Sequence, residues 1–280
     1  MNNMINIPNE AMTHAGRFHA DDVFSAALLR ILNPKINIIR RNFVPDGYQG
    51  LVFDLSGSTF DHHGDNARFR DNGVQYASFG LLWREYGCTL VSEKAAKAFD
   101  ESFIQPLDYQ DNNGGNNLLC RAITQSNPKW DEENANPDDA FFKTVDFARF
   151  ILENEIKSMH SMERAEKIVL ECLEKSKEKI VILPKGLPWK AVLIQKDVLF
   201  VVYPSSRGGY NAQAVPVAID SQQCKKLFPE EWRGKGSELD EITGLKGMIF
   251  CHSHGYLLAA QNMETAVEAC KITMNHTDPL

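Results

Sequence analysis

The chain has 280 residues, of which 43% are hydrophobic and 24% are charged, and its formal net charge is −7. This length suits two domains, and the composition is ordinary for a globular protein. An acidic chain lacks the generally basic surface of a protein that coats duplex DNA. It can still take a phosphate-containing substrate, because bound divalent cations supply a local positive field.

Membrane spans, targeting segments and cysteine motifs, where a sequence contains them, limit the protein's location and the kind of site its cysteines can form. No run approaches the roughly 20 apolar residues of a membrane span, and the opening MNNMINIPNEAM has no basic stretch followed by an apolar core. We therefore expect no membrane association and a cytoplasmic location. The six scattered cysteines contain no C-x-x-C pair, which excludes zinc-ribbon and disulfide-scaffold patterns and favours buried reduced thiols.

The first part of the chain alternates strand and helix patterns. Two acidic residues open an apolar-periodic helix at 21–32, which a proline ends, and apolar runs at 36–40 and 51–55 predict strands. Strands separated by a helix favour a βαβ unit and a parallel sheet. Further helices are predicted at 75–86 and 92–105.

Two turn-rich segments and a long helix follow. Asn, Asp, Gly and Pro cluster at 108–117 and 126–139, which predicts loops around a short helix at 118–124. The charge-mixed stretch 140–177 is helical, with a break expected near Ser158, and it connects two domains.

Short β-type runs separated by turns then replace the long helices. Strands are predicted at 179–183, 191–195, 198–203, 212–217 and 248–252, and helices at 221–232 and 263–273. This pattern indicates a smaller second α/β domain, with the boundary near residue 178.

Four carboxylates and four imidazoles are concentrated in two short segments, THAGRFHADD at 13–22 and LVFDLSGSTFDHHG at 51–64. Each side chain alone could be a helix cap or a solvated loop residue. However, six of the eight histidines fall in three pairs, at 14/19, 62/63 and 252/254. Asp54 also follows a strongly apolar run. Because the carboxyl ends of parallel strands meet at one sheet edge, the two segments predict a two-metal centre with a bridging carboxylate.

The segments THAGRFHADD, LVFDLSG, FDHHG and GVQYASFGLLWREYG resemble the DHH superfamily of phosphoesterases. Within it they resemble the melanocyte-proliferating-gene family of metal-dependent hydrolases. The resemblance continues through SNPKW, NAQAVPV, FPEEWRG and FCHSHGYLLAAQNMETAVEA, and so covers nearly the whole chain. It implies an α/β fold with an N-terminal DHH-type domain over 1–177, built on a mostly parallel sheet flanked by helices. A smaller C-terminal α/β DHH-associated domain would cover 178–280 and bind the substrate.

The resemblance also implies ligands for two divalent metal ions. Mn²⁺ is the usual metal of the superfamily, and Mg²⁺ is the alternative. The first motif matches His14, His19 and Asp21, with His19 in place of the family's usual Asp. Asp54 matches the bridging aspartate, and His62 matches a ligand of the second ion. The fourth motif leaves two candidates open, Asp108, slightly preferred, and Asp111. One ion would then lie on His14, His19 and Asp54, and the other on Asp21, Asp54, His62 and Asp108.

Catalytic and substrate-binding roles follow from the same resemblance. The expected catalytic residues are Asp54, Asp61, His62 and His63. Asp61 would orient a neighbouring imidazole, and His63 would contact the phosphate or donate a proton. The expected substrate-binding residues are His63, Arg207, Gly208, Gly209, His252, His254 and Gly255. From the residues alone, those in the second domain fit two interpretations equally well. They could contact a phosphate, or they could simply form a surface turn and a polar strand end.

Three functions are weighed. The leading hypothesis is a metal-dependent phosphodiesterase, and the resemblance alone implies that it is a 3′→5′ exonuclease acting on RNA or short oligonucleotides. The first alternative is a phosphoesterase for a small molecule such as a nucleotide, a cyclic dinucleotide or pyrophosphate. The second is a catalytically weak metal-binding protein, because His19 replaces a carboxylate ligand and lowers the negative charge of the site.

Overall fold

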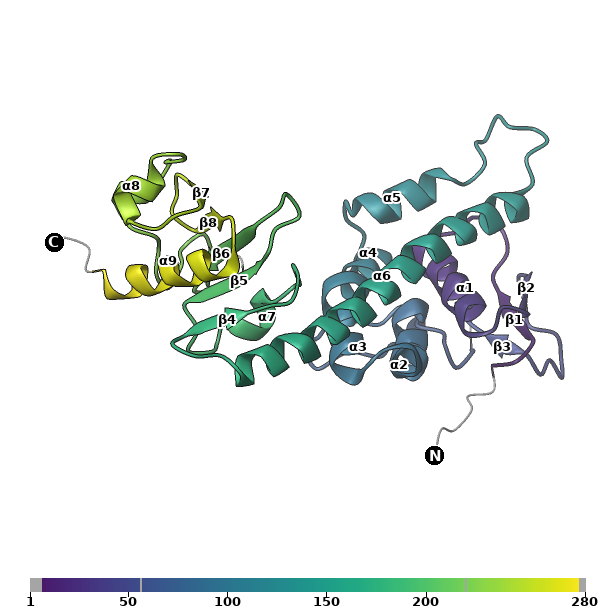
Figure 1. Cartoon of the computed structure of the whole chain (residues 1–280). Coiled ribbons are helices and arrows are strands. Elements are labelled where there is room, and N and C mark those ends of the chain that lie inside the picture. Colours follow the sequence, from purple (N-terminus) through teal and green to yellow (C-terminus); the bar gives the residue numbers. More distant parts are fainter. Residues whose placement is uncertain (1–6, 56, 220, 277–280) are drawn as a thin grey trace. The chain divides into compact units, whose positions relative to one another are not determined.

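The computed structural model describes residues 7–55, 57–219 and 221–276, and it shows a mixed α/β chain (Figure 1). The chain divides into two compact units, residues 1–160 and 161–280. The dividing point lies within the long helix α6 (Pro137–Glu174), ahead of the boundary expected at residue 178. Each unit has its own sheet and its own apolar core.

The sheet of the first unit has three strands in the order β2-β1-β3, and both pairings are parallel. Its strands are β1 (Glu10–Thr13), β2 (Asn37–Arg40) and β3 (Leu51–Val52). Helix α1 (Ala20–Leu32) connects β1 to β2, so the predicted βαβ unit and parallel sheet are confirmed. As β1 is central and β3 is its neighbour, the residues that follow these two strands emerge at the same edge of the sheet.

Helices cover this sheet and form the core of the first unit. They are α1, α2 (Ser78–Leu90), α3 (Glu93–Phe99), α4 (Gln105–Asn113), α5 (Leu118–Gln125) and the first part of α6. Helix α1 is buried from Ala20 to Leu29, and the Phe24 ring stacks on Phe79 of α2 at 5.3 Å between centroids. This packing fixes α1 and α2 side by side, with the first turn of both helices close to the sheet edge.

The segment 108–117, expected to be a loop, is helical as far as Asn113. A π-helical turn, η2 (Asp100–Ile104), leads directly into α4. The side chains of Asn112 and Asn113 find their hydrogen-bond partners within the helix, because each donates to the carbonyl group four residues earlier. Gly114, with φ 72°, then ends the helix. The expected break near Ser158 was also wrong, since α6 is continuous.

The second unit contains a five-stranded sheet in the order β4-β5-β6-β8-β7. Its strands are β4 (Ile180–Ile182), β5 (Phe200–Pro204), β6 (Tyr210–Ala214), β7 (Met248–Cys251) and β8 (Leu257–Ala260). Only β4 and β5 are parallel, and the other pairings are antiparallel. Helix α9 (Met263–Asn275) packs on β5, β6 and β8.

Two predictions for this unit were wrong. The run 191–195 lies largely in the single-turn helix α7 (Lys190–Leu193), which buries Leu193 beside Trp189. A short apolar run does not distinguish strand from helix by periodicity. The expected helix at 221–232 is reduced to a 3-10 turn, η3 (Glu230–Trp232), and a short α8 (Leu239–Thr243) follows. No helix among the described residues is long and apolar enough to cross a membrane.

Candidate metal centre

His14 follows β1 and lies between two carboxylates. Its Nε2 atom is 3.2 Å from Asp54 Oδ2 and 3.3 Å from Asp22 Oδ2. The contact with Asp54 raises the pKa of His14 to about 9, although burial opposes the shift, and the Asp22 charge adds to it. The end of the central strand therefore brings an imidazole against carboxylates from α1 and from the segment after β3.

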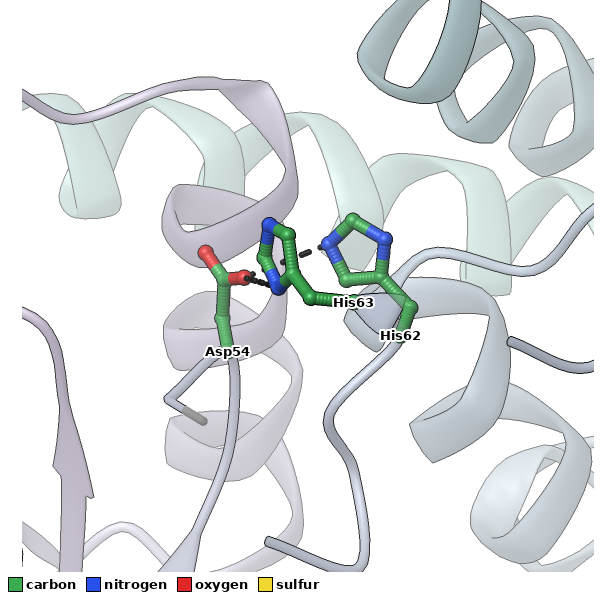
Figure 2. Close-up of side chains that lie close together, drawn as sticks. All are labelled: Asp54, His62 and His63. Carbon is green, nitrogen blue, oxygen red and sulfur yellow. Dashed lines mark ion pairs between the residues drawn. The ribbon is translucent and has the colours of Figure 1, made fainter. Parts of the chain in front are cut away.

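Asp54 occupies the middle of the site, and its backbone has the left-handed φ of 47°. Its second oxygen, Oδ1, lies 3.3 Å from His62 Nε2 and 4.0 Å from His63 Nδ1 (Figure 2). Burial acts to raise the pKa of Asp54, but the contacts with His14 and His62 hold it well below its ordinary range. Asp54 is thus an anion with one oxygen facing each half of the site.

The first turn of α1 supplies two buried carboxylates. Asp21 accepts hydrogen bonds from the backbone N–H groups of Ser78 (3.0 Å) and Phe79 (2.6 Å), at the start of α2. Asp22 accepts from the backbone N–H of His19 at 2.8 Å. Burial raises the pKa of Asp21 well above its ordinary value and that of Asp22 to about 7, and the Asp54 charge contributes to both shifts. Carboxylates gathered in this way need positive charge nearby to remain ionised.

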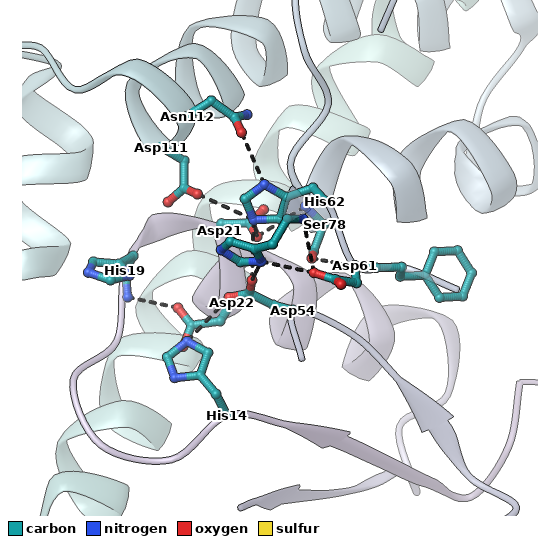
Figure 3. A network of polar contacts seen from close by, with 12 residues as sticks. His14, His19, Asp21, Asp22, Asp54, Asp61, His62, Ser78, Asp111 and Asn112 are labelled. Atoms are coloured by element: carbon teal, nitrogen blue, oxygen red, sulfur yellow. Dashed lines mark hydrogen bonds and ion pairs between the residues drawn. The ribbon is translucent and has the colours of Figure 1, made fainter. Parts of the chain in front are cut away.

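His62 is buried and faces three carboxylates with one nitrogen. Its Nε2 atom lies 3.3 Å from Asp54 Oδ1, 3.5 Å from Asp111 Oδ2 and 3.7 Å from Asp21 Oδ2 (Figure 3). Its other ring nitrogen, Nδ1, lies 3.1 Å from Asn112 Oδ1. Burial opposes protonation of His62, but the contact with Asp54 raises its pKa.

Asp61 and His63 form a pair at the rim of the site. Asp61 is buried and accepts from the Nδ1–H of His63 at 2.9 Å, and also from Asn66 and the backbone of Gly57. Burial alone would raise the pKa of Asp61, but these hydrogen bonds lower it to about 2. The ring of His63 is 63% exposed. Asp61 therefore stays ionised and fixes the orientation of an imidazole that solvent and substrate can reach.

The two carboxylates of α4 have different partners. Asp108 Oδ2 accepts from Arg70 at 2.7 Å, and the same guanidinium also binds both oxygens of Asp100. Asp111, one turn later, lies beside His62, and burial together with the Asp54 charge raises its pKa. Space at Asp108 is tight, because a Cβ atom at Gly80 would lie 2.0 Å from Asp108 Oδ2.

Three overlapping groups of side chains have ligand atoms within 4.8 Å of one another. They are Asp54-His62-His63, His14-Asp22-Asp54 and Asp21-His62-Asp111. Of the metal ligands proposed from the sequence, His19 and Asp108 belong to none of these groups. His19 is exposed, with its ring centroid 6.4 Å from that of His14.

Two residues of this site, Asp22 and Asn112, were not singled out from the sequence. The doubled Asp in HADD was the available signal for Asp22, but an acidic residue in the first turn of a helix is usually read as a cap. Asn112 stands in a run of Asn, Asp and Gly, a composition that predicts a loop.

The site fits divalent cations. His62 Nε2 and Asp22 Oδ2 are fully buried and lack any hydrogen-bond partner within the described parts of the chain. The nearest pairing distances are 3.3 Å from His62 Nε2 to Asp54 Oδ1 and 3.3 Å from Asp22 Oδ2 to His14 Nε2. Buried polar atoms that face a shared space without a hydrogen-bond partner can be satisfied there by a cation. Carboxylate oxygens and imidazole nitrogens are both common ligands of divalent metal ions in proteins.

The candidate residues of the second unit lie in two places. Arg207 is exposed in the β5–β6 turn, where Gly208 and Gly209 have φ of 92° and 68°. A Cβ atom at Gly209 would lie 2.3 Å from the Ala260 carbonyl oxygen, so this glycine allows close approach to β8. The glycines thus have a local structural explanation.

His252 and His254 follow β7, and their rings make a T-shaped contact at 5.3 Å between centroids. With Lys190 and Tyr256 they line a pocket of about 760 Å³. The next residue, Gly255, has φ 67° and passes close to Arg233, leaving no room for a side chain.

Comparison with known proteins identifies the family. Residues 10–274 match the family model MYG1_exonuc, described as "Uncharacterised protein family (UPF0160)". The MYG1 protein of Dictyostelium discoideum is 26% identical, over 95% of this chain and 96% of its own length. The proteins named MYG1 exonuclease from Mus musculus and Homo sapiens are 26% and 25% identical, over 97% and 95% of this chain and 86% of their own lengths. No solved structure matches the chain. A match over nearly the whole sequence places this chain in the MYG1_exonuc family.

Proposed function

We propose that this protein is a phosphodiesterase of the DHH type that uses two divalent metal ions, Mn²⁺ or Mg²⁺, to hydrolyse RNA or short oligonucleotides from the 3′ end. The observation that carries the proposal is the position of Asp54. It belongs to two of the three ligand groups, and each of its oxygens faces a different imidazole. A carboxylate in that position can hold two ions together. The exonuclease names of the mouse and human relatives support the same activity.

The geometry favours a ligand set that differs from the sequence expectation at two positions. We assign the first ion to His14, Asp22 and Asp54, and the second to Asp21, Asp54, His62 and Asp111. Asp22 replaces His19 because its unbonded oxygen already faces His14, and Asp111 replaces Asp108 because Asp108 is bound to Arg70. The exposed His19 would instead contact a substrate phosphate at the rim.

The protein's own groups prepare the reaction in three ways. The carboxylates hold the cations, which would supply the activation of a water nucleophile and the neutralisation of phosphate charge. Backbone N–H groups at the start of α2 fix Asp21, so its oxygens are already oriented. Asp61 accepts from the Nδ1–H of His63. When the imidazole is also protonated on Nε2, that nitrogen can donate a proton to the leaving oxygen or a hydrogen bond to a phosphate oxygen.

The second unit, which we propose as the substrate-binding domain over 178–280, also supports an alternative. The pocket beside His252 and Tyr256 offers one cation, Lys190, and two aromatic surfaces in a volume of about 760 Å³. A mononucleotide fits these features, so a small-molecule phosphoesterase is the second candidate. Turnover of a nucleoside phosphate at least equal to that of an oligonucleotide would favour it.

The test combines metal content with cleavage. The wild-type protein should bind about two Mn²⁺ ions per chain, as a two-metal site requires, and should release mononucleotides from a short RNA. Blocking the 3′ end should stop release, whereas blocking the 5′ end should not. Asp54→Asn should lose both metal and cleavage, while Asp65→Asn, an exposed carboxylate three residues after His62, should keep both. A protein that binds both ions but cleaves no RNA or nucleotide would leave only a metal-binding role.

A further inference from the structure

Asn112 lies on α4 directly after Asp111 and is half-buried. Its amide nitrogen, Nδ2, donates to the carbonyl oxygens of Asp108 at 2.9 Å and Tyr76 at 3.3 Å. These two acceptors determine which way the amide is turned. Its oxygen, Oδ1, must therefore face the remaining neighbour, the Nδ1 atom of His62, at 3.1 Å (Figure 3).

This orientation decides which nitrogen of His62 carries the proton. An amide oxygen only accepts hydrogen bonds, so the 3.1 Å contact requires a proton on Nδ1. A neutral imidazole has one N–H, and its other nitrogen then carries a lone pair. In His62 that other nitrogen is Nε2, the atom that faces Asp21, Asp54 and Asp111.

Without Asn112 the preference would be reversed. The carboxylates around Nε2 are acceptors for a proton on that atom, and an imidazole protonated there cannot bind a cation. No other described residue makes a hydrogen bond to His62 Nδ1. Gln75 supports the same histidine from a different side, because its side chain donates to the His62 carbonyl oxygen at 3.1 Å.

We propose that Asn112 is a positioning residue for the metal centre: its fixed amide oxygen holds the Nδ1–H tautomer of His62 and so presents Nε2 to the second ion. The inference rests on the proposed two-metal function, because it gives Asn112 a role only if His62 is a ligand. Asn112 acts through His62 and does not itself contact the substrate. It also ties the ligand on one side of the site to α4, which carries Asp111.

The test measures Mn²⁺ affinity, from the electron paramagnetic resonance signal of free Mn²⁺, together with the melting temperature of the metal-free protein. Asn112→Leu replaces the side chain with one of similar size that has no hydrogen-bond acceptor. It should weaken binding of the second ion by about 10–100-fold, which is the usual loss when a group that orients a metal ligand is removed. Asn112→Asp keeps an acceptor oxygen towards His62 and should hold affinity at or above the wild-type value. It places a second oxygen against two carbonyl groups, so its melting temperature should fall.

The neighbouring Asn113 supplies matched controls. It is exposed, and its side chain donates to the Tyr109 carbonyl oxygen by the same four-residue pattern. Asn113→Leu controls for the loss of an amide from α4, and Asn113→Asp controls for the added charge. Both should leave Mn²⁺ affinity within about twofold of wild type, as expected for a surface change.

The outcomes separate this inference from the proposed function. Mn²⁺ binding by wild type with unchanged affinity in Asn112→Leu would overturn the positioning role and leave the metal centre intact. Equal losses in Asn112→Leu and Asn112→Asp, in step with their melting temperatures, would show that Asn112 only stabilises α4. A wild-type protein that binds no divalent ion would overturn the two-metal proposal and this inference together.

Discussion

The histidine pairs 62/63 and 252/254 occur in different units and have different surroundings. In the first unit both imidazoles face carboxylates, and His62 is buried among three of them. In the second unit His252 lies 4.4 Å from the Tyr256 ring and 5.3 Å from the His254 ring, centroid to centroid. Within the described residues neither His252 nor His254 pairs with a carboxylate.

The difference shows that two histidines close together in the sequence do not by themselves determine the chemistry of a site, because the surrounding side chains do. Buried carboxylates around an imidazole create a negative space, which suits a cation. Aromatic rings and a lysine around an imidazole create a pocket that suits a nucleobase and its phosphate. We therefore expect changes in the first pair's surroundings to alter metal binding, and changes in the second pair to alter nucleotide binding alone.

The largest effect is expected from Asp111→Asn. It removes a proposed ligand beside His62, so affinity for the second ion should fall by about 100-fold or more. Loss of a group that only orients a ligand lowers metal affinity by up to about 100-fold, and loss of a ligand itself should cost at least as much. Isothermal titration with Mn²⁺ measures this change. Asp108→Asn is the comparison one helical turn away, and it should lower stability while keeping metal affinity. If Asp108→Asn caused the greater loss of metal, our choice between the two carboxylates would be wrong.

His252→Ala should separate the two regions. Loss of the ring that packs against Tyr256 should weaken binding of a nucleoside monophosphate by about 1–3 kcal/mol, the usual contribution of one stacked base. Bound Mn²⁺ should stay at the wild-type level. Fluorescence titration with a labelled nucleotide, alongside metal analysis, checks both. Reduced metal content in this variant would contradict the separation of roles.

Gly80→Ala tests the packing that holds α4 beside the metal centre. The added methyl group would lie 2.0 Å from Asp108 Oδ2 and 2.7 Å from Arg70 Nη2. Both groups are buried, so we expect a loss of about 1–3 kcal/mol in the free energy of unfolding, as is usual for overpacking. Chemical denaturation measures it. An unchanged stability would mean that the Arg70–Asp108 pair can shift freely.

The smallest effect is the pH dependence that Asp61 contributes. Its pKa in the folded protein is about 2, below the ordinary value of 3.8, so ionised Asp61 stabilises the fold. That contribution is fully present above about pH 4 and is lost as the pH falls through about 2. The difference in melting temperature between wild type and Asp61→Asn should therefore shrink as the pH is lowered from 5 to 2, as linkage requires. A difference that stays constant would contradict the assigned hydrogen bonds.

Much of the first unit could be predicted from the sequence, because its signals are local. The periodic pattern of α1 and the apolar run before Asp54 identify a helix and a strand, and parallel pairing then brings His14 and Asp54 together. Helix α4 could not be predicted in this way. Its Asn and Asp side chains are typical of loops, whereas in the structure Asn112 and Asn113 bond to carbonyl groups within the helix, and Asp108 and Asp111 contact Arg70 and His62.

The choice between Asp108 and Asp111 depends on a distant partner. The two residues lie three apart on one helix, so no local pattern distinguishes them. Arg70, 38 residues before Asp108, decides which carboxylate forms an ion pair. Asp22 has no distinguishing local signal for a similar reason, because its proposed role depends on His14, which follows β1, and on Asp54, which follows β3.

The left-handed backbone at Asp54 limits which substitutions this position can accept. Among residues with a side chain, only Asn and Asp adopt a φ near 47° at little cost, and glycine does so freely. Alanine and glutamate would strain the turn as well as changing the chemistry. A library of all twenty residues, sorted for folded protein, should therefore recover mainly Asp, Asn and Gly, and only the first of these should retain activity. The tolerance profile of this single position would thus separate what the chain requires for folding from what the reaction requires.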